Sequence, residues 1–145
     1  MDNSLHVSFG TPIHGWLPVD LKYQKFHLEF EASDVLNDPL DELFNILIIQ
    51  QHYKSEQVTW WLEPGAYFFE FEWNEDAITL IISETHDLHD DKVERIVIQI
   101  ITGERKQIIE PFRNALIQFC SQTIEESHWA SNMDKSKIEK LSADK

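Results

Sequence analysis

The sequence predicts an α+β fold, a mainly antiparallel sheet of about six to seven strands with two helices packed on one face. Two observations lead to this class. Several short segments alternate apolar with polar residues or are rich in β-branched residues, which is typical of strands. Two longer segments repeat apolar residues at intervals of three and four, which is typical of helices. Successive strands are close enough in sequence to pair as hairpins, and this favours an antiparallel sheet.

The first three predicted strands precede the first helix. Residues 5–9 alternate, and residues 16–23 form an irregular strand in which Pro18 favours an edge position. Residues 25–31 alternate strictly, so this strand has one apolar and one polar face. The apolar face holds Phe26, Leu28 and Phe30, and the polar face holds Lys25, His27, Glu29 and Glu31.

A helix is predicted at about residues 39–52. Asp38 is a good N-cap, and Pro39 suits the first helical position because no helical bond needs its missing N–H. The apolar residues that recur at helical spacing are Leu40, Leu43, Phe44 and Leu47.

Residues 56–63 and 66–73 are predicted to form a hairpin around Pro64 and Gly65. A two-residue turn would place Trp61 opposite Phe68. A longer loop would shift this pairing and leave the faces of each strand unchanged. One face carries Val58, Trp60, Leu62, Tyr67, Phe69 and Phe71; the other carries Trp61 and Phe68 among Glu63, Glu70 and Glu72.

Two β-branched strands, at residues 77–83 and 93–101, complete the sheet, and a final helix begins near Gly103. Pro111 is expected to kink this helix or to start a second helical segment, because it cannot donate a backbone hydrogen bond. The apolar stripe of the helix comprises Ile108, Ile109, Phe112, Leu116, Phe119 and Cys120. We expect Phe69, Phe71 and Phe112 to be buried.

Length and composition indicate one domain, which we place at residues 1–122, followed by a polar and flexible tail at residues 123–145. The N-terminus lacks a signal-peptide pattern, and no window holds an apolar run long enough to span a membrane. The single cysteine, Cys120, cannot form an internal disulfide. We therefore expect a soluble protein in the cytoplasm.

The net charge of −14 is concentrated in the middle of the chain. Residues 26–94 contain 17 acidic residues and two lysines, a net charge of −15. Such a field repels phosphate backbones, so nucleic acid is an unsuitable partner, and it attracts a basic protein surface. The alternative is that the acidity serves only solubility.

The segment at residues 84–92 could be interpreted as a metal site, because His86 and His89 lie among three aspartates. Histidines three residues apart share a face on a helix, whereas this segment connects two predicted strands. A structural zinc site also needs four protein ligands, and the sequence offers no second histidine or cysteine cluster. We therefore interpret the segment as a solvated loop and expect no metal or cofactor.

The remaining residues with reactive side chains do not indicate an enzyme. Cys120 lies on an apolar helical stripe, which suits a structural thiol better than a nucleophile. Glu63, Glu70 and Glu72 could supply paired carboxylates for acid–base catalysis, but glutamates at alternate strand positions usually face water. No phosphate-binding, dinucleotide-binding, serine-hydrolase or zinc-protease motif is present in the sequence. These residues favour a protein without catalytic activity, and a small enzyme of unknown reaction stays an alternative.

The aromatic pair Trp61 and Phe68 favours protein binding. Large rings among Glu63, Glu70 and Glu72 would combine aromatic anchors with charges that steer a partner. We predict that these five residues bind a partner. The alternative is that a helix or the tail covers the two rings.

Three segments resemble a family of small, acidic bacterial proteins that are similar to the immunity proteins of toxin–immunity pairs. The segments are Gly10-Thr11-Pro12 through His14-Gly15-Trp16-Leu17-Pro18-Val19, then Ser33-Asp34-Val35-Leu36-Asn37-Asp38-Pro39, and Trp60-Trp61-Leu62-Glu63-Pro64-Gly65. The resemblance brings no catalytic or other functional residues with it. Together with the acidic charge and the aromatic pair, it favours a protein-binding module, an immunity-type inhibitor of a basic toxin or of another basic protein. The alternatives are a homodimeric domain and a small enzyme of unknown reaction.

Overall fold

The structure, a computed structural model, confirms the α+β class with one seven-stranded antiparallel sheet in which sequential strands are neighbours. It describes residues 4–48, 55–87, 90, 92–125, 128–129 and 135–143. The strands are β1 (Leu5–Phe9), β2 (Trp16–Tyr23), β3 (Phe26–Ser33), β4 (Ser55–Trp61), β5 (Ala66–Trp73), β6 (Ile78–Thr85) and β7 (Ile96–Gly103). The helices are α1 (Pro39–Ile48), α2 (Arg105–Cys120) and α3 (Lys135–Ala143).

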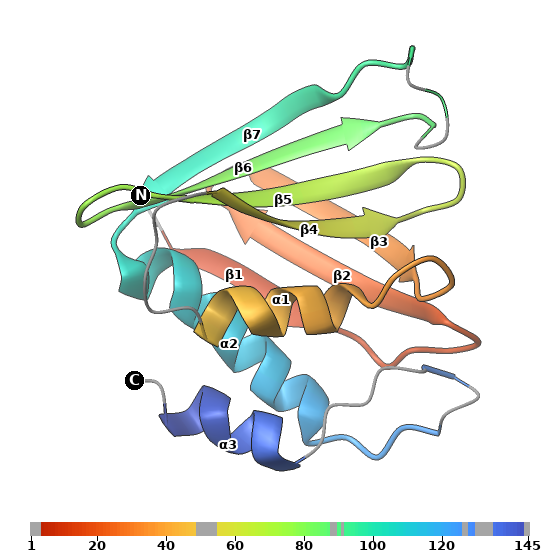
Figure 1. Cartoon of the computed structure of the whole chain (residues 1–145), viewed down its shortest axis with the longest axis vertical. Coiled ribbons are helices and arrows are strands. Elements are labelled where there is room, and N and C mark those ends of the chain that lie inside the picture. The colour runs from red at the N-terminus through yellow and green to blue at the C-terminus, as the bar shows by residue number, and fades with distance from the viewer. Residues whose placement is uncertain are drawn as a thin grey trace.

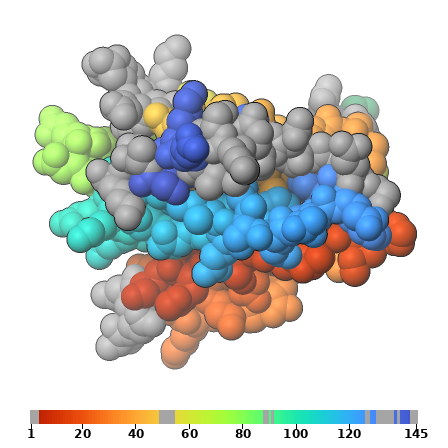
Figure 2. Space-filling model, turned by 90° about the horizontal axis from the view of Figure 1, so that it is seen from below, coloured from red at the N-terminus to blue at the C-terminus, as the bar shows by residue number. Residues whose placement is uncertain are grey.

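The sheet curves around α1 and α2, so the helices share one side of it (Figure 1). We call this side the core face and the opposite side the outer face. Helix α2 runs across the helical side of the molecule beside β1 (Figure 2). The predicted burial of three phenylalanines is confirmed, because Phe69, Phe71 and Phe112 are each 0% exposed. Alternation in the strands therefore identified the core face correctly.

The sequence predicted two helices and a polar tail, whereas the structure adds α3 within that tail. Leu141 of α3 is 0% exposed, and Trp129, which precedes the helix, is 3% exposed. Both side chains belong to the main hydrophobic core. The core thus extends beyond residue 122, because isolated apolar residues in a polar segment still bury large areas when the chain folds back.

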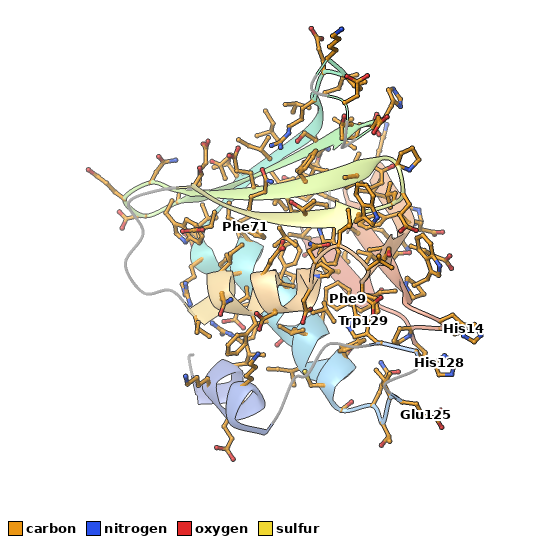
Figure 3. The ribbon with its side chains drawn as sticks, turned by 45° about the vertical axis from the view of Figure 1, so that its right-hand side comes forward. Phe9, His14, Phe71, Glu125, His128 and Trp129 are labelled. Atoms are coloured by element: carbon orange, nitrogen blue, oxygen red, sulfur yellow. The ribbon has the colours of Figure 1, made fainter. Side chains whose placement is uncertain are left out.

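Contacts with the β1–β2 connection position the segment that contains Trp129 (Figure 3). The Gly15 N–H donates to the His128 carbonyl oxygen over 2.7 Å. The His14 N–H donates to His128 Nδ1 over 3.1 Å, and the centroids of the two imidazole rings lie 5.0 Å apart. Gly15 has φ +83°, a backbone conformation that is strained for residues with a side chain, so the turn favours glycine.

The sheet is nearly interrupted between β3 and β4, which share one residue pair, Ser33 with Trp61. Side chains at the start of α1 occupy part of the free edge of β4. The Asn37 amide donates to the Thr59 carbonyl oxygen over 2.7 Å, and the Thr59 N–H donates to Glu42 Oε1 over 2.9 Å. Both backbone groups of Thr59 are thus satisfied on the edge of β4 that lacks a neighbouring strand.

Trp60 packs against rings from both sides of this interruption. It is 0% exposed, and its ring centroid lies 5.9 Å from that of Phe9 in β1 and 5.8 Å from that of Phe30 in β3. The centroid of Phe69 in β5 lies 5.4 Å away. The aromatic cluster therefore joins β1–β3 to β4–β7 where the backbone ladder does not.

The β4–β5 hairpin differs from the two-residue turn that the sequence suggested. Trp61 pairs with Ala66 and Thr59 pairs with Phe68, so the loop comprises residues 62–65. The Leu62 N–H donates to the Gly65 carbonyl oxygen over 2.7 Å inside this loop. The pairing shifts by two residues, and each side chain keeps its predicted face because side-chain direction repeats every two residues.

Helix α2 is a single element with Pro111 inside it, rather than two helical segments. It begins two residues after Gly103, close to the predicted start. The Glu104 N–H donates to Gln107 Oε1 over 2.9 Å, which satisfies one backbone donor at the helix start.

We predict that Phe69→Ala lowers the free energy of unfolding by about 3–5 kcal/mol, because it opens a cavity among buried rings. The matched control is Ile100→Ala on β7, where the side chain is 55% exposed. This control should change the free energy by less than about 0.5 kcal/mol. Urea unfolding measures both. Equal shifts for the two variants would show that the core face is wrongly assigned.

Candidate interaction surface

The outer face of the sheet carries acidic side chains on both sides of the β3–β4 interruption. Val19 of β2 and Phe69 of β5 are buried in the core, so every second residue from them faces the core and the residues between face outward. Cross-strand partners lie on the same face, which assigns the faces of the neighbouring strands. The acidic residues that face outward are Asp20, Glu29, Glu31, Glu70 and Glu72. Lys22 on β2 is a basic residue on the same face.

The structure does not leave Trp61 and Phe68 open as anchors. Trp61 is 3% exposed and Phe68 is 2% exposed, and with Ala66 they form a second, small hydrophobic cluster. The two rings do share the outer face, as predicted. A partner could contact the residues around Trp61 and Phe68 but not the ring faces themselves. The prediction that these two side chains act as aromatic anchors is therefore corrected.

Arg95, from the connection between β6 and β7, covers Phe68. Its guanidinium carbon lies 3.6 Å from the centroid of the Phe68 ring, which is a cation–π contact. Its Nη1 donates to Gln57 Oε1 over 2.7 Å, and this bond fixes the guanidinium above the sheet. The sequence offered no signal for this contact, because Arg95 and Phe68 are brought together only by the pairing of β5, β6 and β7.

The three predicted glutamates have different positions. Glu70 and Glu72 face outward from β5 and are half-buried, as the alternation indicated. Glu63 lies in the loop between β4 and β5, and its side chain is exposed at the end of the sheet. The predicted group is therefore split between the outer face and one end of the sheet.

A second group of polar residues, which sequence analysis did not assemble, lies on β2 and β3. Asp20 pairs directly with Glu29, and His27 precedes Glu29 by two residues on the same face. His27 Nε2 lies 3.1 Å from Asp20 Oδ2 and 3.0 Å from Glu29 Oε1. The alternation of β3 had placed His27 and Glu29 together, but the position of Asp20 depends on the β2–β3 register.

An open hollow of about 460 Å³ adjoins these carboxylates. Its lining comprises Ser8, Gly10, Pro18, Val19, Asp20, Glu29, Phe30 and Glu31. Three of these residues are acidic, so a cation or a basic side chain suits the hollow better than an anion.

The segment at residues 84–92 is only partly described, because residues 88, 89 and 91 lie outside the described residues. Its first two residues end β6. The Lys92 N–H donates to Asp90 Oδ1 over 2.9 Å, so this carboxylate takes part in a local turn. The expectation that the segment binds no metal stays a prediction, because His89 is among the residues not described.

Cys120 and Tyr67 both retain their protons near neutral pH. Burial raises the pKa of the Cys120 thiol to about 11, so the thiolate that a nucleophile requires is scarce. Burial, together with the carboxylate of Glu84, raises the pKa of Tyr67. These shifts agree with structural roles for both side chains.

Strand β7 contributes exposed apolar residues at the edge of the sheet. Val97 is 53% exposed and Ile100 is 55% exposed, and both face outward. Ile81 on β6 pairs with Ile100 and is half-buried beside it. We call Ile81, Val97 and Ile100 the β7 patch.

Among the described helices, none has the length and apolar character needed to cross a membrane.

Comparisons of the chain with protein-family models, curated proteins and solved structures gave no match. The resemblance to immunity proteins therefore stays a prediction, and the function is argued from the surface described above.

We predict that Arg95 and Phe68 are energetically coupled by about 0.5–1 kcal/mol, the range of a solvent-accessible cation–π contact. A double-mutant cycle with Arg95→Ala and Phe68→Leu, read by urea unfolding, measures this coupling. The control cycle combines Phe68→Leu with Lys92→Ala in place of Arg95→Ala. Lys92 is another exposed basic residue, three positions before Arg95 in the sequence. The control coupling should be near zero. A coupling free energy of zero in the Arg95 cycle as well would contradict the cation–π contact.

Proposed function

We propose that this protein is a protein-binding module that holds a basic protein on the outer face of its sheet, in the manner of an immunity-type inhibitor. The observation that supports this is the distribution of charge over the sheet. The helices pack on the core face, while the outer face carries Asp20, Glu29, Glu31, Glu70 and Glu72.

Charge accounts for recognition and for the speed of association. An acidic face attracts a basic surface over roughly the Debye length, about 8–10 Å at physiological ionic strength. Such steering raises association rates and fixes orientation more than it raises affinity. The same field repels phosphate groups, so nucleic acid remains an unsuitable partner.

The apolar contribution to binding is assigned to the β7 patch rather than to Trp61 and Phe68. Protein interfaces combine an apolar centre with a polar rim. Val97 and Ile100 are open to a partner, and Glu70 pairs across β5 and β6 with Ile81. Glu70 and the exposed Ile100 are therefore both cross-strand neighbours of the half-buried Ile81 on the outer face.

The decisive experiment begins with capture of a partner from a lysate of the producing organism at low salt, followed by its identification and association kinetics at two salt concentrations. The test variant removes three outer-face carboxylates: Glu31→Gln, Glu70→Gln and Glu72→Gln. The matched control removes three exposed acids from other surfaces: Glu75→Gln, Asp76→Asn and Glu139→Gln.

We expect the test variant to associate at least about tenfold more slowly, with a weaker salt dependence and a nearly unchanged dissociation rate. The control should keep most of the wild-type rate, although both variants lose the same formal charge. Ile100→Ala should mainly speed dissociation, because it removes an apolar contact. Equal slowing in both triple variants, or an acidic partner, would contradict the proposal.

Self-association through β7 is the second candidate. β7 is an edge strand, and its eight residues include no charged side chain. Natural edge strands usually carry charges or prolines that prevent pairing with another chain. Sedimentation equilibrium would reveal a dimer, and Val97→Lys should dissociate it. A monomer at all accessible concentrations would exclude this candidate.

A further inference from the structure

The geometry points to a zinc-binding site formed by Asp20, His27 and Glu29 on the outer face of β2 and β3. Their ligand atoms, one imidazole nitrogen and two carboxylate oxygens, all lie within 4.8 Å of one another. No other group of three histidine, cysteine or acidic residues converges in this way among the described residues. The inference goes beyond the proposed function and does not depend on it.

The strand register holds the three side chains together. Asp20 and Glu29 are direct cross-strand partners, and His27 shares their face two residues away. β2 and β3 are paired along eight residues, and Val19 and Leu28 beside the site are buried in the core. The backbone under the site is therefore a rigid frame, which is what a preorganised metal site requires.

The two distances from the imidazole nitrogen to the carboxylate oxygens are close to those of a tetrahedral zinc complex. Bonds of about 2.0–2.1 Å to nitrogen and oxygen place neighbouring ligand atoms about 3.3–3.4 Å apart. His27 Nε2 lies 3.1 Å from Asp20 Oδ2 and 3.0 Å from Glu29 Oε1. Small rotations of the side chains would widen these separations enough to admit the ion, without movement of the strands.

The carboxylates favour a cation between these residues, and Lys22, the cross-strand partner of His27, offsets one of their charges. Two carboxylates directly opposite each other on paired strands repel, and Glu31 adds a third on the next outward position of β3. A proton on His27 would supply one positive charge between them, whereas a divalent ion supplies two. The combination of one imidazole and two carboxylates suits zinc better than magnesium, which prefers oxygen ligands alone.

The site has room for further ligands. The side chains of Asp20, His27 and Glu29 are 33%, 43% and 67% exposed. Asp20 and Glu29 also line the hollow of about 460 Å³. Three protein ligands with an accessible fourth position define an open zinc site, in contrast to the closed four-ligand sites that stabilise folds. Water would complete the shell in the isolated protein.

Calorimetric titration of the purified chain with Zn²⁺ alone tests the inference. Co²⁺ provides a second measurement, because a tetrahedral site gives it a characteristic visible absorption. We expect one Zn²⁺ per chain, with affinity at least about tenfold weaker in His27→Ala and in Glu29→Gln. Millimolar Mg²⁺ should not compete. Urea unfolding of each variant checks that it is folded, since both side chains lie on the surface.

The matched control is His86→Ala, which removes another exposed histidine and should bind Zn²⁺ as the wild type does. Binding that is lost in this control would place the metal at residues 84–92 and overturn the inference. Absence of binding at 100-fold excess over a chain concentration of about 10 μM would also overturn it. Glu31, Glu70 and Glu72, which the partner-binding test alters, are unchanged here, so the two proposals can fail separately.

Discussion

The structure depends on the packing around Trp60, because the sheet is joined by one residue pair between β3 and β4. Each missing backbone hydrogen bond forgoes about 1 kcal/mol of net stability, whereas a buried phenylalanine contributes about 1.5–3 kcal/mol. Trp60 contacts Phe9, Phe30 and Phe69, which belong to three strands on both sides of the interruption. Aromatic packing therefore joins the two parts of the sheet across the incomplete ladder, and side chains near the start of α1 satisfy the backbone groups of Thr59.

This arrangement determines which surface is left for function. The helices are needed on the core face, where they cover the aromatic cluster, and the outer face retains its carboxylates and the β7 patch. The acidic residues of β2 and β3 lie on one side of the interruption, and those of β5 lie on the other. A partner can meet them as a single surface only if the two parts of the sheet keep a fixed relative position.

Local pattern predicted the faces of the strands, but it could not predict contacts that depend on register. Alternation placed Phe69 inward and Glu70 outward, and a two-residue error in the hairpin left both assignments intact. The burial of Phe68 depends on Arg95, which reaches it across two strand pairings. Asp20 meets His27 only through the β2–β3 register. Trp129 looked like part of a polar tail because its neighbours are polar.

Hydrogen exchange of individual backbone amides tests most directly whether the two parts of the sheet form one cooperative unit. The account predicts that the slowest amides of β2 and of β5 exchange with the same opening free energy, equal to that of global unfolding. Val19 and Phe69, at the centres of these strands, are both buried in the main core and are suitable probes. If the amides of β1–β3 instead opened together at a lower free energy, the core around Trp60 would not unite the sheet, and a single outer surface would be contradicted.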